Sequence, residues 1–258
     1  MPGNYVLVAT PTAGNLVSAG YASTLIGFAR AARDVGWDFD NLAFDGADVV
    51  MARNFLANHV LRDRRVTHML FLDSDMRVQQ PVIARFLVTD KPMLGAVYPR
   101  RQIDLGRYGA ALKAGSSEDE ARALAMDFNV KIAGSSMRVN DGICEVEGLG
   151  FGCVIIRRDL LERMVEAGVA PKVRSGVLKG QGLGDTHFDF FSTLPLEGGG
   201  YLSEDYSFCA RVRQMEGGQV WAYIGAGVAH LGAYSYDASF ETQLMARQQA
   251  AKPHQTSG

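Results

Sequence analysis

The sequence predicts an α/β protein with one open, mostly parallel sheet flanked by helices. Two observations carry this prediction: apolar strand-like runs alternate with helical segments along the chain, and neither a linker nor an internal repeat divides its 258 residues. A chain of this length is compatible with one large unit. We therefore expect a single domain over residues 1–251, followed by a flexible tail over residues 252–258.

The first elements are a strand, a helix and a second strand. A β-rich run over residues 5–10 ends at Pro11, which predicts a buried strand that stops at a ligand-binding loop. A helical period over residues 23–35 ends at Gly36, and residues 40–44 form the second strand-like run. This order is typical of the start of a βαβ unit.

The next elements continue the alternation. Residues 50–61 have a helical pattern, and residues 69–72 are a continuous apolar run typical of a strand buried on both faces. Pro81 suits the first turn of the following helix, and a strand is expected over residues 93–97. The loop over residues 98–101 contains two arginines, which either approach phosphates or remain in a solvated loop.

The remaining elements are predicted from caps, glycines and apolar runs. Ser117 and Glu120 have the spacing of a capping box, and Gly168 ends a later helix. Residues 171–200 are rich in glycine and form the longest irregular stretch, as in mobile active-site loops. The expected elements are helices over residues 117–126, 158–168, 204–216 and 237–251, and strands over residues 153–156, 219–224 and around His230.

Composition and charge exclude several classes of protein. With 47% hydrophobic residues the chain is not intrinsically disordered, and no apolar run is long enough to span a membrane. The 26 basic and 28 acidic side chains give a formal charge of −2, which supplies no general field for nucleic acid or anionic lipid. Three dispersed cysteines do not make a disulfide framework. We therefore expect a cytoplasmic protein.

Two aspartates directly follow the predicted strand over residues 69–72. Asp73 and Asp75 are therefore expected at the carboxyl edge of the sheet, where open α/β folds bind ligands. Their oxygens suit Mg²⁺ or Mn²⁺, ions that proteins share with substrate phosphates. A polar turn after a strand is the alternative interpretation. His230 lies on a short apolar strand, where a core residue is more common than a ligand, although Mn²⁺ accepts imidazole readily.

Four segments, in this order, resemble the nucleotide-sugar-dependent glycosyltransferases of the GT-A fold, as found in DxD-containing bacterial and phage enzymes. They are Phe71-Leu72-Asp73-Ser74-Asp75, Tyr201-Leu202-Ser203-Glu204-Asp205-Tyr206-Ser207-Phe208-Cys209, Gly217-Gly218 and His230-Leu231-Gly232. The resemblance covers about residues 5–236. It implies a Rossmann-like GT-A domain with a nucleotide-sugar half over about residues 5–100 and an acceptor and metal half over about residues 145–236.

The resemblance also implies roles for the matching residues. Asp73, Asp75 and His230 would hold a divalent metal, Mn²⁺ or Mg²⁺, with Asp75 the more direct ligand and Asp73 nearer the ribose. The other donor-binding residues would be Pro11, Thr12, Arg53, Asn54 and Ser74. For Arg53, an exposed cation on a helix surface is an equally good interpretation.

The resemblance places the acceptor chemistry in two further segments. Glu204 and Asp205 match the acidic pair of which one carboxylate takes the proton of the attacking hydroxyl; the alternative is an anion pair stabilised by a helix N-terminus. Gly150, Phe151 and Gly152 would face the sugar and the acceptor, although a tight turn into a strand explains the glycines equally well.

The function implied is that of a metal-dependent hexosyltransferase. It would move one sugar from a nucleotide diphosphate donor, UDP first and GDP second, to a hydroxyl acceptor. A glycan is the favoured acceptor, and a hydroxylated base in phage DNA is the second, because a near-neutral charge argues against a large DNA partner.

Two other functions remain open. His187 and Asp189, with His230, form the two-histidine, one-carboxylate pattern of non-haem Fe(II) oxygenases, although the alternating N-terminal half does not match their double-sheet jelly roll. A non-catalytic sugar-nucleotide-binding module would keep the fold without turnover. The joint presence of Asp73, Asp75, Asp205 and His230 argues for activity, since a pure binder needs no base.

Overall fold

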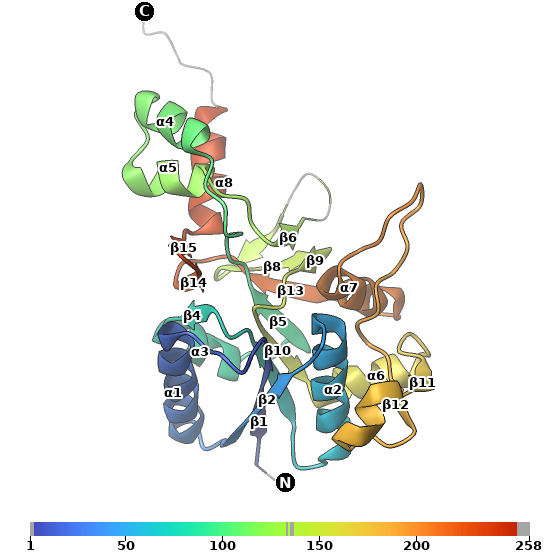
Figure 1. Ribbon diagram of the computed structural model, residues 1–258. Helices are drawn as coiled ribbons and strands as arrows, with labels where there is room; N and C mark the ends of the chain where they lie inside the picture. The colour runs from blue at the N-terminus through green and yellow to red at the C-terminus, as the bar shows by residue number, and fades with distance from the viewer. Residues whose placement is uncertain (1–2, 133, 135–136, 252–258) are drawn as a thin grey trace, which may run out of the picture.

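The computed structural model describes residues 3–132, 134 and 137–251, so the predicted tail over residues 252–258 lies outside the described residues. It confirms the α/β class with a large, mainly parallel sheet flanked by helices (Figure 1). The strand order of this sheet is β2-β1-β3-β10-β5-β13-β8-β7. Within the described residues, none of the helices is both long and apolar enough to cross a membrane.

The N-terminal half follows the predicted alternation, but its first strand and first helix are longer than expected, and a short strand after Asp75 was not predicted. Its elements are β1 (Tyr5–Thr12), α1 (Ala19–Asp34), β2 (Asp38–Asp45), α2 (Val49–Arg62), β3 (His68–Leu72), β4 (Met76–Val78), α3 (Gln80–Leu87) and β5 (Met93–Ala96). Pro11 was expected to end β1, but the strand continues to Thr12. Proline is tolerated there because the pairing of β1 with β3 ends at Ala9, which leaves one side of the strand unpaired.

The C-terminal half contains short elements that the sequence did not indicate. Its elements are α4 (Leu105–Lys113), α5 (Glu118–Leu124), β6 (Val130–Lys131), β7 (Val139–Asn140), β8 (Ile143–Val146), β9 (Gly148–Leu149), β10 (Cys153–Arg157), α6 (Arg158–Glu166), β11 (Lys172–Arg174), a 3₁₀ helix (Gly176–Gln181), β12 (Thr186–Phe188), α7 (Glu204–Gln214), β13 (Val220–Tyr223), β14 (Val228–Leu231), β15 (Ser235–Asp237) and α8 (Phe240–Ala250). The capping box of Ser117 and Glu120 forms as predicted. Helix α4 was not predicted, and the stretch expected to be irregular contains β11, the 3₁₀ helix and β12. Helices α4, α5 and α8 form a lobe at one end of the sheet (Figure 1).

Helices cover both faces of the main sheet and bury two separate cores. Successive strand residues point to opposite faces, so Val8 and Leu70 pack with Phe28 of α1, whereas Phe71 packs with Leu56 of α2. None of these five side chains has exposed surface. Burial on both faces explains why β3 is a continuous apolar run.

Strand β10 lies between β3 and β5 and runs antiparallel to both. Cys153, at its start, pairs with Leu72, at the end of β3. The glycine-rich turn before β10 is thereby brought to the carboxyl edge of the sheet, where the Asp73 N–H donates to the Gly152 carbonyl at 2.9 Å. The antiparallel direction of one strand thus joins two segments that lie far apart in the sequence.

A three-stranded sheet, in the order β15-β14-β4, lies beside this edge. Strand β4 begins immediately after Asp75, and β14 pairs with it antiparallel, with His230 opposite Met76. The Leu231 N–H donates to the Asp75 carbonyl at 2.7 Å. This sheet therefore places His230 next to the aspartates of the N-terminal half.

The half-buried imidazole of His68 makes the free energy of unfolding depend on pH. Burial and then the charge of Arg157 lower the pKa of His68 from 6.5 to about 4, and its ring packs on Trp37 with a centroid distance of 4.5 Å. The unfolded chain takes up a proton near pH 6.5 that the folded protein binds only near pH 4. The free energy of unfolding should therefore fall as the pH is lowered through this window.

His68→Phe keeps an aromatic ring but cannot take up that proton. Between about pH 7 and pH 4, the wild type should lose about 1–2 kcal/mol more unfolding free energy than the variant, after allowance for partial solvent screening. Urea unfolding followed by circular dichroism at both pH values measures the difference. If the wild type and His68→Phe lose the same unfolding free energy between about pH 7 and pH 4, His68 is not the group that titrates.

Candidate functional site

The predicted donor residues at the ends of β1 and β3 line one cavity. Pro11, Thr12 and residues 73–75 surround a volume of about 280 Å³ together with the start of α2. The hydroxyl of Thr12 is buried and has no hydrogen-bond partner within residues 3–132, 134 and 137–251. A buried polar atom without a partner costs free energy. The cavity thus offers a ligand an unused hydrogen-bonding group, and it is lined by three aspartates, Asp48, Asp73 and Asp75.

Asp75 and His230 form a close pair at this edge. The Nε2 of His230 lies 3.2 Å from the Asp75 Oδ2, and its Nδ1 lies 3.3 Å from the Pro99 carbonyl oxygen. A carbonyl oxygen only accepts, so Nδ1 carries a proton, as in histidines that bind a metal through the other nitrogen. Nε2 and the carboxylate oxygen then attract each other only if a proton or a metal ion lies between them.

The charge of the Asp75 carboxylate is favoured by its neighbours. Burial alone would raise the pKa of Asp75, but the hydrogen bond and charge of His230, together with the charge of Arg101, lower it below its usual value. An ionised carboxylate beside an imidazole nitrogen is a suitable donor set for Mn²⁺ or Mg²⁺, with the remaining ligands from water or phosphate.

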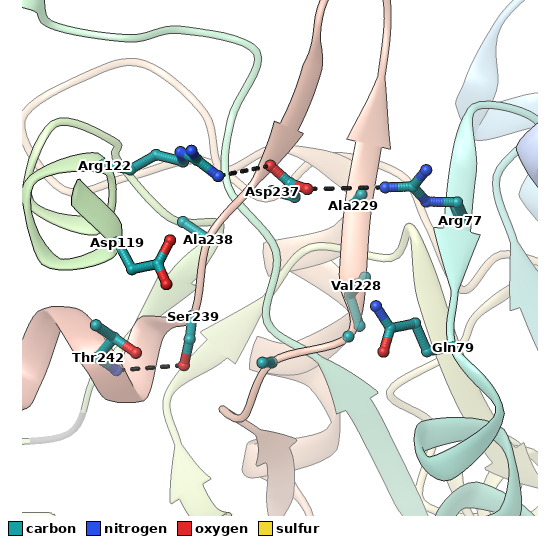
Figure 2. Close-up of a pocket in the computed structure, with 12 residues that line it drawn as sticks. Arg77, Gln79, Asp119, Arg122, Val228, Ala229, Asp237, Ala238, Ser239 and Thr242 are labelled. Carbon is teal, nitrogen blue, oxygen red and sulfur yellow. Dashed lines mark hydrogen bonds and ion pairs between the residues drawn. The ribbon is translucent and has the colours of Figure 1, made fainter.

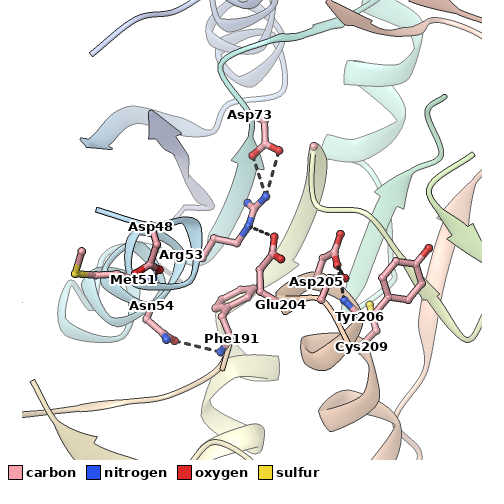
Figure 3. A network of polar contacts seen from close by, with 12 residues as sticks. Asp48, Met51, Arg53, Asn54, Asp73, Phe191, Glu204, Asp205, Tyr206 and Cys209 are labelled. Carbon is pink, nitrogen blue, oxygen red and sulfur yellow. Dashed lines mark hydrogen bonds and ion pairs between the residues drawn. The ribbon is translucent and has the colours of Figure 1, made fainter. Parts of the chain in front are cut away.

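Asp73 is turned to a buried arginine instead (Figure 3). The Arg53 Nη2 lies 3.1 Å from the Asp73 Oδ1, and the Arg53 Nε lies 3.5 Å from the Glu204 Oε1. The guanidinium carbon lies 5.2 Å from the centroid of the Phe71 ring. Burial would lower the pKa of Arg53, but Asp73 and Glu204 outweigh it and hold the guanidinium charged. Arg53 is thus a buried bridge between two carboxylates, not an exposed cation.

The three predicted metal ligands do not form one preassembled cluster. Among the residues that the structure describes, no three His, Cys, Asp or Glu side chains are grouped so that they could hold a metal ion. Asp75 and His230 are paired, while the Asp73 carboxylate is occupied by Arg53.

Asn54, predicted to bind the donor, anchors a loop instead. Its Nδ2 donates to the Asp189 Oδ1 at 2.9 Å, and its Oδ1 accepts from the Phe190 N–H at 2.8 Å. Asn58, one turn later on α2, holds the backbone of Phe188 in the same way. The two amides therefore fasten residues 188–190 to α2, because they satisfy backbone groups and the Asp189 carboxylate in a buried segment.

The oxygenase interpretation is not supported by this geometry. The His187 Nδ1 lies 3.3 Å from the Ser175 hydroxyl, Asp189 is held by Asn54, and His230 is paired with Asp75. Among the described residues these three side chains do not form a metal-binding group. The mainly parallel sheet also differs from a double-sheet jelly roll.

The acidic pair begins α7, as predicted, but its two carboxylates differ in environment. Glu204 faces Arg53, whereas Asp205 Oδ1 accepts from the Tyr206 N–H at 2.7 Å and from the Ser203 hydroxyl. Ser203 occupies the N-cap position, but its hydroxyl makes no capping bond to the helix. Burial and then the charge of Glu204 raise the pKa of Asp205 above its usual value.

The glycine-rich turn packs against Tyr98, a residue that the sequence did not single out. The Gly152 N–H donates to the Tyr98 hydroxyl at 3.1 Å, and a Cβ on Gly150 would lie 2.5 Å from that oxygen. Phe151 is fully buried, with its ring centroid 5.0 Å from that of Phe208. The tight-turn interpretation thus accounts for these residues, and Phe151 presents no surface to an acceptor. In the sequence, only the position of Tyr98 just after a predicted strand indicated that it lies near the site.

A second cavity, of about 240 Å³, lies on the other face of the small sheet (Figure 2). Ala229 of β14 lines it, while its neighbour His230 points to the opposite face. Arg77 and Arg122 each lie 3.7 Å from Asp237, so both cations of this cavity are paired with one carboxylate, while Asp119 also lines it. The cavity beside Asp73 and Asp75 is therefore the candidate functional site.

Comparison with known proteins gives only distant likenesses. No family model and no curated protein matches the chain. Among solved structures, A197 from STIV is 17% identical with a TM-score of 0.46, and the match covers 93% of this chain and 91% of that one. A glycosyltransferase involved in the glycosylation of the major capsid of PBCV-1 is 12% identical, with a TM-score of 0.33 and coverage of 70% and 68%. A mannose-1-phosphate geranyltransferase from Thermus thermophilus is 11% identical, with a TM-score of 0.39 and coverage of 86% and 74%. At these TM-scores we draw no functional argument from the likenesses.

The bridge made by Arg53 can be tested through stability. Arg53→Met keeps an apolar stem but leaves Asp73 and Glu204 without their counter-charge, so the free energy of unfolding should fall by about 3 kcal/mol. Asp73→Asn in the same chain should recover part of this loss, because one of the stranded charges is removed.

Urea unfolding of the wild type, Arg53→Met, Asp73→Asn and the double variant gives the coupling. The double variant should be less destabilised than the sum of the two single variants. Strict additivity, or a single Arg53→Met variant as stable as the wild type, would show that the bridge does not stabilise the fold.

Proposed function

We propose that this protein is a metal-dependent glycosyltransferase that moves a sugar from a nucleotide diphosphate donor, UDP first and GDP second, to a hydroxyl acceptor. The observation that carries the proposal is the pair of Asp75 and His230 on the edge of the cavity lined by residues 73–75. This pair lies beside a cavity at the carboxyl edge of the sheet, where open α/β folds bind ligands. A carboxylate and an imidazole leave coordination positions of a divalent ion free for the phosphates of a donor.

In this proposal the cavity holds the nucleoside. Thr12 supplies a hydroxyl with an unused hydrogen-bonding capacity, and the α2 N-terminus closes the wall opposite the aspartates. Asp75 and His230 would hold Mn²⁺ or Mg²⁺, an ion that would supply positive charge to a diphosphate leaving group. Asp73 supports the site through Arg53.

Asp205 is the proposed base. Glu204 is committed to Arg53, whereas Asp205 is held by a hydroxyl and one backbone N–H and has a raised pKa. A carboxylate whose pKa is raised toward the working pH is a better acceptor for the proton of a hydroxyl. A carboxylate that acts as a base beside the acceptor favours inversion of configuration at the sugar carbon.

The acceptor is proposed to be a glycan. Residues 192–203 form an arm, drawn in orange, that projects from the body just before α7 (Figure 1). A bridge between Pro195 and Tyr201 closes the arm, and Tyr201 is 70% exposed. An exposed aromatic ring close to Asp205 in the chain offers a flat face to a sugar ring. A hydroxylated DNA base remains the second acceptor class.

Two variants separate donor binding from turnover. Asp75→Ala should weaken Mn²⁺-dependent UDP binding by about 100-fold, because half of the protein's ligand pair is lost. Asp205→Asn should bind UDP as the wild type does but lower kcat by about 10²–10⁴-fold, because the base is lost.

Calorimetry with Mn²⁺ and UDP measures binding, and release of labelled sugar from a panel of UDP- and GDP-sugars measures turnover. Asp34→Asn, on the exposed end of α1, is the matched control and should change neither. A wild type that binds UDP but never transfers or hydrolyses any donor would favour a non-catalytic binding module.

The pH dependence tests the role of Glu204. Asp205 must be ionised to accept a proton, so kcat/KM should rise with pH through a pKa above the ordinary value of 3.8. Glu204→Gln removes a neighbouring negative charge, so the acid limb should move to lower pH. An acid limb that stays at the same pH in Glu204→Gln would show that Asp205 is not the group that titrates.

A further inference from the structure

The guanidinium of Arg101 contacts the same Asp75 carboxylate oxygen that faces His230. The Arg101 Nη1 is 3.2 Å from the Asp75 Oδ2, and the His230 Nε2 is 3.2 Å from that oxygen. Nη1 also lies 3.5 Å from the Leu231 carbonyl oxygen. About half of the Arg101 side chain is exposed. One oxygen of the proposed metal site is therefore already in contact with a cation.

The fold builds this contact from three segments. The Leu231 N–H donates to the Asp75 carbonyl at 2.7 Å, which joins the end of β14 to the aspartate loop. At Gly232 a Cβ would lie 3.2 Å from the Arg101 Cδ, so the missing side chain lets the arginine stem lie against the strand end.

The segment before Arg101 contacts the other proposed ligand. The carbonyl of Pro99 receives the His230 Nδ1–H, and the Tyr98 ring meets the His230 ring edge-on at a centroid distance of 5.4 Å. Residues 98–101 thus contact both Asp75 and His230. These contacts hold the backbone of Arg101 beside the proposed metal site.

A guanidinium and a divalent ion cannot both use the Asp75 oxygen well. A metal ion needs the oxygen lone pair at about 2.0–2.1 Å, and its double charge repels a guanidinium a few ångströms away. Arg101 must therefore leave Asp75 when a metal binds. Because the stem is long and half-exposed, the guanidinium can turn to a nearby diphosphate, whose oxygens suit its planar fork.

We propose that Arg101 is an exchangeable counter-ion of Asp75, which it neutralises in the donor-free protein and leaves for the donor's diphosphate when the metal binds. The inference rests on the proposed function and assigns to Arg101 the coupling of metal to donor. A metal alone must displace the guanidinium without compensation, whereas metal and diphosphate together give it a new partner. By linkage, each ligand then raises the affinity for the other.

The test compares the full-length wild type with Arg101→Gln in two titrations. In the first, Mn²⁺ is added without nucleotide, and binding is followed by electron paramagnetic resonance of free Mn²⁺. Arg101→Gln should bind Mn²⁺ about fivefold more tightly, the size expected for a lost exposed ion pair. In the second, UDP is added at saturating Mn²⁺, and the variant should bind about tenfold more weakly, because a charge-assisted contact is lost.

Arg100→Gln is the matched control. It removes the same charge one position away, but the Arg100 Nε donates to the Asn129 Oδ1 at 3.0 Å. Its Mn²⁺ affinity should stay within about twofold of the wild type, since its guanidinium is held at Asn129 and not at Asp75, and salt at 0.15 M screens exposed charges. Gly232→Ala is a second test variant, because its Cβ displaces the Arg101 stem; it should change both affinities in the same directions as Arg101→Gln.

The outcomes separate this inference from the function on which it rests. A wild type that binds Mn²⁺ and UDP, with an Arg101→Gln variant that binds Mn²⁺ no more tightly, overturns the role of Arg101 alone. An equal gain in Arg100→Gln also overturns it, because net charge would then explain the effect. A wild type that binds neither Mn²⁺ nor UDP overturns the proposed function and this inference together.

Discussion

The buried guanidinium of Arg53 is the interaction on which the rest of the site depends. It joins Asp73, at the end of β3, to Glu204, at the start of α7, and it lies over the Phe71 ring. Taking such a charge out of water costs several kcal/mol, which only close carboxylates offset. The end of β3 and the acidic pair of α7, which come from opposite halves of the chain, are therefore held together by one side chain of α2.

This bridge divides otherwise similar carboxylates into two kinds. Asp73 and Glu204 are committed to Arg53, so neither has its full charge available for a ligand. Asp75 faces an imidazole and a half-exposed arginine, whereas partial burial and then the charge of Glu204 raise the pKa of Asp205. Different environments give identical side chains different chemical roles. In the proposed function, these environments would give Asp75 the metal and Asp205 the proton.

Two features of topology deliver these side chains to one edge. The antiparallel β10 brings Gly152 and its partner Tyr98 against the aspartate loop, and the pairing of β14 with β4 brings His230 to Asp75. Tyr98 then contacts both the glycine turn and His230, so the two arrangements support each other. The loop that begins at Tyr98 consequently lies beside the aspartate loop, which is why Arg101, three residues further on, reaches the Asp75 carboxylate.

The sequence by itself determined the alternating N-terminal elements, the position of Asp73 and Asp75 at the end of a buried strand, and the start of α7, because periodicity, capping and turn chemistry act over a few residues. Only the tertiary structure decided that β10 runs antiparallel, that Arg53 is buried between two carboxylates, and that Asn54 anchors a loop. Those contacts join residues that are far apart in the chain; Asn54 and Asp189 are separated by 135 positions. A local pattern shows that a polar side chain is present, but its partner depends on which distant segments the packed sheet brings together.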